Sequence, residues 1–192
     1  MIKIEKTLSD IPDILTNKST ESKRNRLIHA QKWQSGSSYK SPYQSNDVRK
    51  KLKLVYHNKC AYCEQRIVLP KQKTNKQRNN SLTIEHYRPK STYYWLAYSW
   101  DNLLPVCYAC NHAKGHDFEI MNDPIINIRP NEIDHIHQLA VSYNEEEQPL
   151  FIHTEIDDLA NELIFHKDGD ISSENIRCNH VIDKCELKRE DL

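Results

Sequence analysis

Residues 60–63 read CAYC, residues 107–110 read CYAC, and the segment SLTIEH (81–86) lies between them. Each C-x2-C pair can direct two thiolates at one cation, and two pairs complete the tetrahedral four-thiolate site that is typical of structural zinc. The 43 residues between the pairs are more than a simple zinc ribbon needs, so something must fold between them. The sequence therefore predicts one structural Zn²⁺ ion, and we expect its ligands to be Cys60, Cys63, Cys107 and Cys110.

The composition limits the class of protein and its expected compartment. The chain has 192 residues, of which 28% are charged and 38% hydrophobic. No run of roughly 18 apolar residues is present to span a membrane, and the opening MIKIEKTLSD has no apolar signal region. The expected compartment is therefore the cytoplasm, where thiols stay reduced. Metal binding is favoured over unrelated buried thiols or a redox pair, whereas Cys178 and Cys185 are interpreted as ordinary thiols on one helix face.

The net charge of zero hides a division along the chain. Residues 18–90 carry 18 Lys and Arg against 4 Asp and Glu, whereas residues 117–192 carry 6 against 19. The basic segment suits a phosphate backbone, which the acidic segment would repel. The alternative is that the two segments attract each other within the molecule. We expect the acidic segment to be a docking surface for a partner protein.

Periodicity and turn residues predict a mixture of helices and short strands. Ser19 or Thr20 can cap a first helix, and Asn46 can cap a second. The stretch WDNLLPVCYACNHAKG (100–115) is expected to be a turn, the second cysteine pair and the start of a helix. The expected elements are helices at 20–34, 47–57 and roughly 173–192, strands at 81–86, 148–153 and 162–172 with a turn at Asp168-Gly169, and loops at 35–45 and 70–81.

The insert and the second cysteine pair share a further pattern, which reads IEHYRPKS, WDNLLPVC and CYACNHAKG. Over residues 60–116 the chain resembles the HNH endonuclease superfamily. The resemblance rests on a strand that ends in an acidic residue and His, an Asn in a following turn, and a C-x2-C pair followed by Asn. The opening MIKIEK, the stretch WLAYSWDNLLP and the later PLFIH and IFHKDGDIS resemble the HNH nuclease subunit of Septu anti-phage systems. In those systems an ABC-type ATPase subunit accompanies the nuclease.

The resemblance implies a role for each polar residue of the pattern. His86 would be the general base, because a His with a pKa near neutrality suits the activation of water. Glu85 and Asn111 would bind a catalytic Mg²⁺ or Mn²⁺ ion, since such ions prefer oxygen ligands. If Asn111 only caps the helix, His112 is the next candidate ligand. Asn102 would hold the His86 loop in place by hydrogen bonds across the turn.

Further polar and aromatic residues surround this pattern. Arg88 and Lys114 are candidates for contact with a substrate phosphate, and His116 is a further candidate metal ligand. The Tyr and Trp residues at 93–100 are expected to pack in the core rather than stack on bases.

These expectations describe an α+β protein, in which a ββα-metal HNH core is stabilised by a four-cysteine zinc site. The expected regions are 1–56, with N-terminal helices; 57–120, the nuclease core; and 121–192, an acidic C-terminal α/β extension. The leading function is a metal-dependent endonuclease, the effector of an anti-phage complex with an ATPase, with DNA favoured because the superfamily mostly cuts DNA. The alternatives are an RNase with the same site, for example one that cleaves tRNA, and a non-catalytic zinc-stabilised module that binds nucleic acid or acts as a scaffold.

Overall fold

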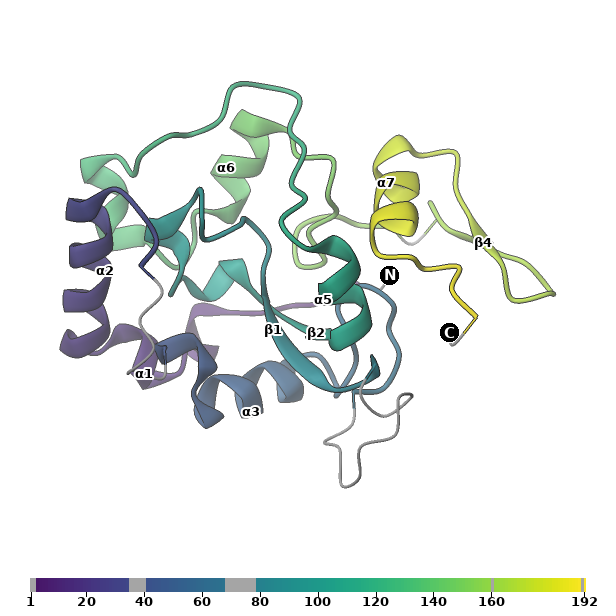
Figure 1. Cartoon of the computed structure of the whole chain (residues 1–192), viewed down its shortest axis with the longest axis horizontal. Helices are drawn as coiled ribbons and strands as arrows, with labels where there is room; N and C mark the ends of the chain where they lie inside the picture. The colour runs from purple at the N-terminus through teal and green to yellow at the C-terminus, as the bar shows by residue number, and fades with distance from the viewer. Residues whose placement is uncertain (1–2, 35–40, 68–78, 160, 191) are drawn as a thin grey trace.

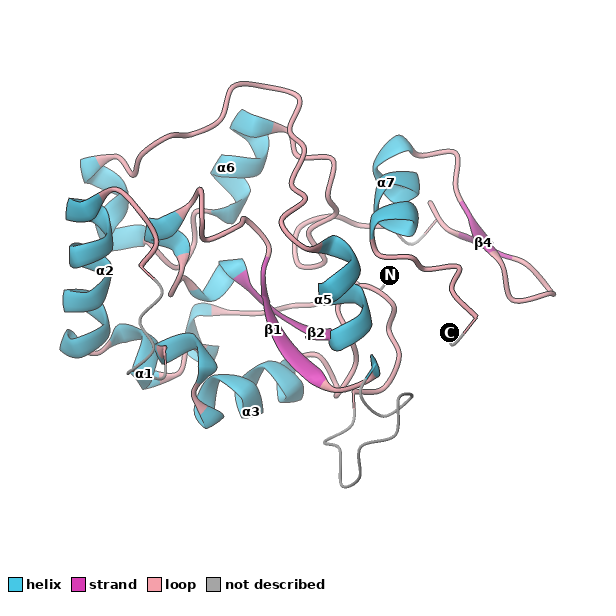
Figure 2. Ribbon diagram, in the orientation of Figure 1, coloured by secondary structure: helices cyan, strands magenta, loops and turns pink. Residues whose placement is uncertain are grey.

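The computed structural model of the chain describes residues 3–34, 41–67, 79–159, 161–190 and 192 (Figure 1). Two antiparallel strand pairs are present, β1 (Leu82–His86) with β2 (Leu103–Cys107) and β3 (Ile164–Phe165) with β4 (Ile171–Ser172) (Figure 2). No helix in these ranges is long and apolar enough to cross a membrane. The helices are α1 (Asp13–Thr16), α2 (Lys18–Ala30), α3 (Asn46–Val55), α5 (Tyr108–Lys114), α6 (Ala140–Glu147) and α7 (Ile176–Lys184), with short 3-10 segments at Leu8–Asp10, Pro42–Gln44, Tyr94–Leu96, Trp100–Asn102 and Pro130–His135.

The β1–β2 pair and α5 lie near the centre of the molecule, between α3 and α7 (Figure 1). His86 pairs with Leu103 and Leu82 pairs with Cys107, so His86 and the second cysteine pair lie at opposite ends of this sheet. β2 leads directly into α5, which ends at Gly115 with φ +55°, a conformation that glycine adopts without Cβ strain. The chain therefore places two antiparallel strands and one helix around the polar residues of interest.

The strand predicted at 81–86 is confirmed as β1, whereas the interpretation of Leu103–Cys107 as a turn is wrong. All five residues of β2 are buried, so the segment lacks the apolar–polar alternation that marks a strand with one solvated face. The Pro105 carbonyl accepts a 2.9 Å hydrogen bond from the Ala61 N–H. β2 is therefore covered on one edge by β1 and tied on the other to the first cysteine pair.

The two N-terminal helices are confirmed, but each begins earlier than predicted. α2 follows Asn17, whose side chain accepts a hydrogen bond from the backbone N–H of Thr20. α3 follows Ser45, whose hydroxyl accepts from the N–H of Val48, so Asn46 is the first helical residue and not the cap. In both cases another residue of capping type, closer to the N-terminus, takes the position.

The segment before the C-terminal hairpin differs most from the prediction. Residues 148–153 do not form the expected strand, because only Pro149 pairs, in a single bridge with Ile120. α6 was not expected; its sequence AVSYNEEE buries only Tyr143 and Glu147 and so has no clear apolar face.

The hairpin predicted at 162–172 is confirmed as β3–β4, with Gly169 at φ +89° in its turn. α7 ends at Lys184 and is therefore much shorter than the helix predicted at 173–192. The loops expected at 35–45 and 70–81 lie mainly outside the described residues.

Two clusters of buried side chains form the core, and each joins the central region to a flanking one. The aromatic segment 93–100 is buried, which confirms its interpretation as core. The first cluster, around β2 and the cysteine pairs, includes Tyr56, Leu104, Val106, Phe151, Ile152, Cys178, Val181, Ile182 and Cys185. The second, between α2, α3 and α6, includes Leu15, Leu27, Val48, Leu52, Trp95, Trp100 and Tyr143.

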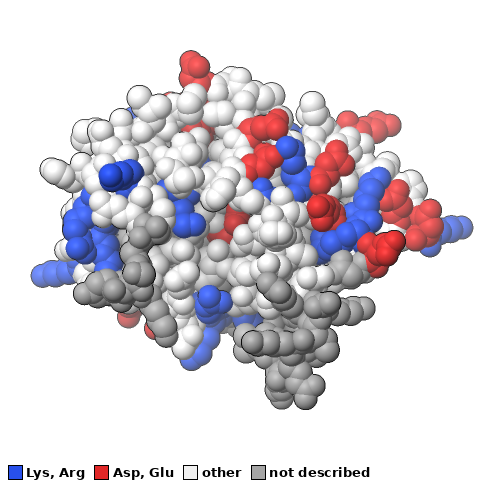
Figure 3. Space-filling model, viewed as in Figure 1, with Lys and Arg blue, Asp and Glu red and all other residues white. Residues whose placement is uncertain are grey.

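Charged residues divide across the surface as they do along the sequence. On the face shown in Figure 3, Asp and Glu gather on the right among some Lys and Arg, whereas Lys and Arg lie at the left and lower edges. Among the described residues, one ion pair joins the basic segment 18–90 to the acidic segment 117–192: Arg88 and Glu147, 2.9 Å apart. Other pairs, such as Arg177 with Asp157, lie within the acidic segment. Within the described ranges, ion pairing between the two segments is therefore limited to the pair of Arg88 with Glu147.

Candidate metal centre and active site

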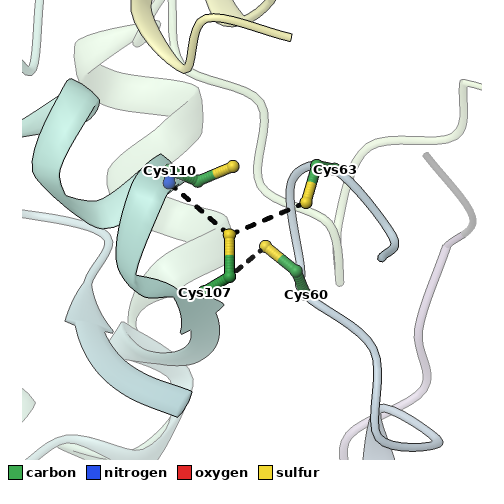
Figure 4. Close-up of side chains that lie close together, drawn as sticks. All are labelled: Cys60, Cys63, Cys107 and Cys110. Carbon is green, nitrogen blue, oxygen red and sulfur yellow. Dashed lines mark hydrogen bonds between the residues drawn. The ribbon is translucent and has the colours of Figure 1, made fainter. Parts of the chain in front are cut away.

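Four cysteines converge from the loop after α3 and from the β2–α5 junction (Figure 4). The sulfur atoms of Cys60, Cys63, Cys107 and Cys110 all lie within 4.8 Å of one another. The Cys63 and Cys107 sulfurs are 3.7 Å apart, as expected around a tetrahedral ion with metal–sulfur bonds of about 2.3 Å. The cluster could therefore hold a metal ion, and a set of four thiolates suits zinc.

Hydrogen bonds orient these side chains. The Cys107 N–H donates to the Cys60 sulfur over 3.3 Å, and the Cys110 N–H donates to the Cys107 sulfur over 3.5 Å. Hydrogen bonds from Cys110 and the other two thiols hold the pKa of Cys107 below its usual value. At Cys107 this favours the thiolate, which is the form that binds a metal, whereas burial raises the pKa of Cys60 and bonds with the other thiols raise that of Cys110.

The C-terminal segment covers the cysteine cluster. Arg189 directs Nη1 at the Cys110 sulfur over 3.5 Å and Nη2 at the Cys107 sulfur over 3.9 Å. Gln65, just after the first cysteine pair, donates to the main-chain oxygen of Leu192 over 3.0 Å. A cationic donor at this place offsets part of the negative charge that four thiolates would carry around a divalent ion.

His86 ends β1 and is only 5% exposed. Its Nε2 lies 3.0 Å from the Ala97 carbonyl oxygen. A carbonyl only accepts, so Nε2 carries the proton and Nδ1 keeps its lone pair. Burial, reinforced by the charge of Lys90, lowers the pKa of His86 to about 3, below the near-neutral value expected from the sequence. The imidazole is therefore neutral at pH 7, with Nδ1 able to accept a proton.

Glu85 precedes His86 and is paired with Lys114. The Lys114 Nζ lies 2.7 Å from Glu85 Oε1, and the two side chains are 0% and 8% exposed. Burial raises the pKa of Glu85, and the Lys114 charge opposes that shift. α5 turns Lys114 inward, with its Nζ 5.0 Å from the centroid of the Phe151 ring. Lys114 is thus an internal counter-ion, and its position does not support the expected contact with a substrate phosphate.

Asn111 is the fourth residue of α5, so it does not cap the helix; Cys107 does. Its Nδ2 donates to the Thr83 hydroxyl over 2.8 Å, and that hydroxyl donates to the Val106 carbonyl over 2.8 Å. Because the Thr83 proton is used on Val106, Thr83 can only accept from Asn111, which fixes the orientation of the amide. The Asn111 Oδ1 is the atom left for a ligand.

Glu85, His86 and Asn111 line one cavity of about 300 Å³. The rest of its wall comes from β1, the turn after it and α5, and consists of Ile84, Pro89, Lys90, Tyr108, His112, Gly115 and His116. The structure therefore brings together the expected base, both expected metal ligands and the alternative ligand His112. Lys90 was missed by the sequence analysis, although its place directly after Pro89, in the turn that follows His86, was a signal.

Asn102 holds this turn from inside the protein. Its Oδ1 accepts from the Arg88 N–H over 2.8 Å, and its Nδ2 donates to the Arg88 and Leu96 carbonyls over 3.1 and 3.3 Å. Asn102 is thus a positioning residue that bonds across the turn. The Arg88 side chain is buried and donates to Glu147 and Asn144, both over 2.9 Å. It does not line the cavity, so its position does not support the expected phosphate contact.

Comparison with known proteins identifies the central region. Residues 60–117 match the family model described as HNH endonuclease. The chain is 42% identical over 72 residues to the Septu protein PtuB of Bacillus thuringiensis. The aligned region is 37% of this chain and 24% of the relative. It is 35% identical over 95 residues to the Septu protein PtuB of Bacillus mycoides (strain KBAB4). In this case the aligned region is 42% of this chain and 29% of the relative.

The chain therefore carries an HNH endonuclease domain and is similar to Septu PtuB proteins over part of its length. It spans only 24% and 29% of the length of these two curated relatives. No solved structure matches the chain.

Proposed function

We propose that this protein is a metal-dependent endonuclease that hydrolyses phosphodiester bonds of nucleic acid. The observation that carries the proposal is the fixed tautomer of His86, whose Nε2 is held by the Ala97 carbonyl while Nδ1 has no hydrogen-bond partner among the described residues. The same cavity holds Glu85 and Asn111, and the HNH match over residues 60–117 supports the same reaction. A module that only binds nucleic acid has no use for this arrangement.

In the proposed reaction, Nδ1 of His86 accepts a proton from a water molecule as the water oxygen attacks the phosphorus atom, and the bond from phosphorus to the leaving sugar oxygen breaks. One strand end then keeps the phosphate and the other a hydroxyl, which takes its proton from water. The lowered pKa keeps the imidazole unprotonated at neutral pH. A phosphodiester that enters the cavity brings negative charge, which makes proton uptake by the imidazole more favourable. The Tyr43 ring, 4.5 Å from the imidazole and edge-on to it, helps to hold the base in place.

Glu85 and Asn111 are the residues that would hold the catalytic divalent ion. Their carboxylate and amide oxygens fit Mg²⁺ or Mn²⁺, and two protein ligands leave positions for water and phosphate oxygens. Such an ion, when bound, neutralises charge on the phosphate and stabilises the leaving oxygen. Thr83 orients the Asn111 amide, and Lys114 favours the ionised form of Glu85 despite its burial. The four cysteines would hold a separate, structural Zn²⁺ ion.

We further propose that the nuclease is the effector of an anti-phage defence complex in the cytoplasm, with an ABC-type ATPase as partner. Similarity to two Septu proteins supports this role. DNA is the favoured substrate because the HNH superfamily mostly cuts DNA. RNA, such as tRNA, is the alternative, because the scissile phosphate is common to both polymers.

The proposal is tested by incubating the purified chain with plasmid DNA and with total tRNA, with and without a co-expressed ATPase. We expect at least one substrate to be cleaved in Mg²⁺ or Mn²⁺, and cleavage to stop after the free divalent ions are removed. Added zinc should not restore it, since the proposed ligands are oxygen donors. Absence of cleavage under all of these conditions would contradict the proposed function.

A further inference from the structure

Lys90 is the one Lys or Arg among the described residues that lines the His86 cavity. It follows Pro89, whose carbonyl accepts hydrogen bonds from the N–H groups of Thr92 and Tyr93 over 3.0 and 2.8 Å. The backbone of the turn is therefore fixed on both sides of Lys90, since Asn102 holds Arg88, two residues before it. The side chain starts from a rigid base beside the proposed catalytic residue.

The Lys90 ammonium lies against two aromatic rings. Its Nζ is 5.6 Å from the centroid of Trp33 and 5.9 Å from that of Tyr43, within the range of cation–π attraction. The Tyr43 ring also contacts the His86 ring, with 4.5 Å between centroids. The ammonium and the imidazole are therefore packed around the same tyrosine, on the side of the cavity where the water must be activated.

In the described part of the chain, the Lys90 ammonium forms no ion pair with a carboxylate. The neighbouring cations are paired, Arg88 with Glu147 and Lys114 with Glu85. Outside that part the sequence has one acidic residue, Asp191, and the next residue, Leu192, accepts a hydrogen bond from Gln65 beside the cysteine cluster, at the other end of the β1–β2 sheet from His86. Burial lowers the pKa of Lys90, and the charge of the nearby Glu85, which is itself paired with Lys114, opposes that shift. Lys90 thus differs from Arg88 and Lys114, which are already neutralised.

We propose that Lys90 binds a phosphodiester group of the substrate by contact with a non-bridging phosphate oxygen beside His86. This inference rests on the proposed nuclease function and names the residue that holds the substrate backbone. A phosphate oxygen supplies the counter-charge that the ammonium lacks.

Three variants separate charge from packing, each made in the His86→Ala background so that the probe is not consumed. Lys90→Met removes the charge and keeps an aliphatic stem on the two rings, whereas Lys90→Arg keeps the charge. Lys50→Met is the matched control, because Lys50 is exposed on α3 and does not line the cavity. Fluorescence anisotropy measures Kd at several salt concentrations for two labelled probes, a duplex DNA and a single-stranded RNA.

Lys90→Met should raise Kd about tenfold for the probe that the wild-type chain cleaves and reduce the salt slope by about one unit, the signature of one lost phosphate contact. Lys90→Arg should stay near the parent value. Equal Kd values and salt slopes for Lys90→Met and Lys50→Met on both probes would overturn the assignment. Circular dichroism and zinc content check that each variant is folded.

Cleavage by the same variants with His86 restored separates this outcome from failure of the proposed function. If the wild-type chain cuts and Lys90→Met binds and cuts as well as Lys50→Met, the nuclease stands and the Lys90 assignment is wrong. If the wild-type chain cuts neither polymer, the proposed reaction is wrong, and loss of binding in Lys90→Met would still identify the phosphate contact.

Discussion

Side-chain hydrogen bonds fix the polar groups of the cavity before any substrate enters. The residue types of Glu85, His86 and Asn111 could be chosen from the sequence because their pattern carries the chemistry. The tautomer of His86 could not, since it depends on the Ala97 carbonyl, eleven residues away. The internal role of Lys114 depends in the same way on packing between residues distant in sequence. A short pattern gives residue types, whereas exposure and partners come from the tertiary fold.

Asn102 offers a test of this positioning at the residue scale. Asn102→Ala leaves the buried N–H and C=O of Arg88 without their partner, which should lower the free energy of unfolding by about 1–3 kcal/mol. Displacement of the turn should also reduce the cleavage rate by roughly 100-fold, mainly through kcat. Asn102→Asp keeps the acceptor for the Arg88 N–H but places a carboxylate oxygen against the Arg88 and Leu96 carbonyls, so it should not restore the activity. Urea unfolding and single-turnover cleavage measure both effects, and a folded Asn102→Ala with wild-type kcat would show that the turn needs no such support.

Helices and strands could be predicted where apolar and polar residues alternate or recur so that one face is exposed. They could not be predicted where the whole element is buried. α2, α3, β1 and the β3–β4 hairpin follow from periodicity and turn residues. β2 is buried throughout and α6 has no apolar stripe, so neither pattern was visible. The segment after α7 was predicted to continue the C-terminal helix, but it instead packs on the cysteine cluster through Arg189.

Arg189→Met tests that contact between the C-terminal segment and the cysteine cluster. Loss of an outer partner of metal-bound thiolates should weaken zinc binding by about 10–100-fold, because the negative charge of the thiolates is less well balanced. Competition with a coloured chelator measures the affinity. Lys188→Met is the control, since Lys188 is exposed and pairs with Asp170 instead. The same zinc affinity for both variants would show that the Arg189 contact has no effect on the metal.

Across the whole molecule, stability should depend on pH through buried neutral histidines. Burial lowers the pKa of His137 to about 4 and that of His153 to about 3. Below the unfolded value of about 6.5, the unfolded chain binds protons that the folded chain does not. The free energy of unfolding should therefore fall as pH drops from 6.5 toward 5, by up to about 1.4 kcal/mol per pH unit for each group.

His137→Asn isolates one of these groups. In the wild-type chain, His137 Nδ1 accepts a hydrogen bond from the backbone N–H of Trp100 over 3.0 Å. The Asn side-chain oxygen can take over as the acceptor, and the amide does not titrate. Urea unfolding between pH 7 and pH 5.5, with zinc content monitored, should give a shallower slope for the variant. An unchanged slope would mean that His137 is protonated in the folded protein as readily as in the unfolded one.

The exposed residues of the acidic segment 117–192 also act at the scale of the whole molecule. Glu145 is exposed, whereas Glu147 is fully buried and bonded to Arg88, so only the first is available to a partner. If the surface docks a basic partner, Glu145→Lys should slow association with the co-expressed ATPase, most clearly at low salt. Glu21→Lys, on the exposed side of α2, should leave the rate unchanged. Surface plasmon resonance measures both, and equal rates would place the docking surface elsewhere.

The most direct test of the central claim is single-turnover cleavage by a His86→Ala variant whose zinc content and circular dichroism match those of the wild-type chain. Because the cysteine cluster lies at the other end of the sheet, the zinc site should stay in place, while loss of the buried ring and of its bond to the Ala97 carbonyl should lower the free energy of unfolding by about 1–3 kcal/mol. Cleavage of plasmid DNA or tRNA in Mg²⁺ should fall by about 10²–10⁴-fold, the usual contribution of a general base. A folded, zinc-loaded His86→Ala protein that cleaves at the wild-type rate would contradict the assignment of His86 as the base.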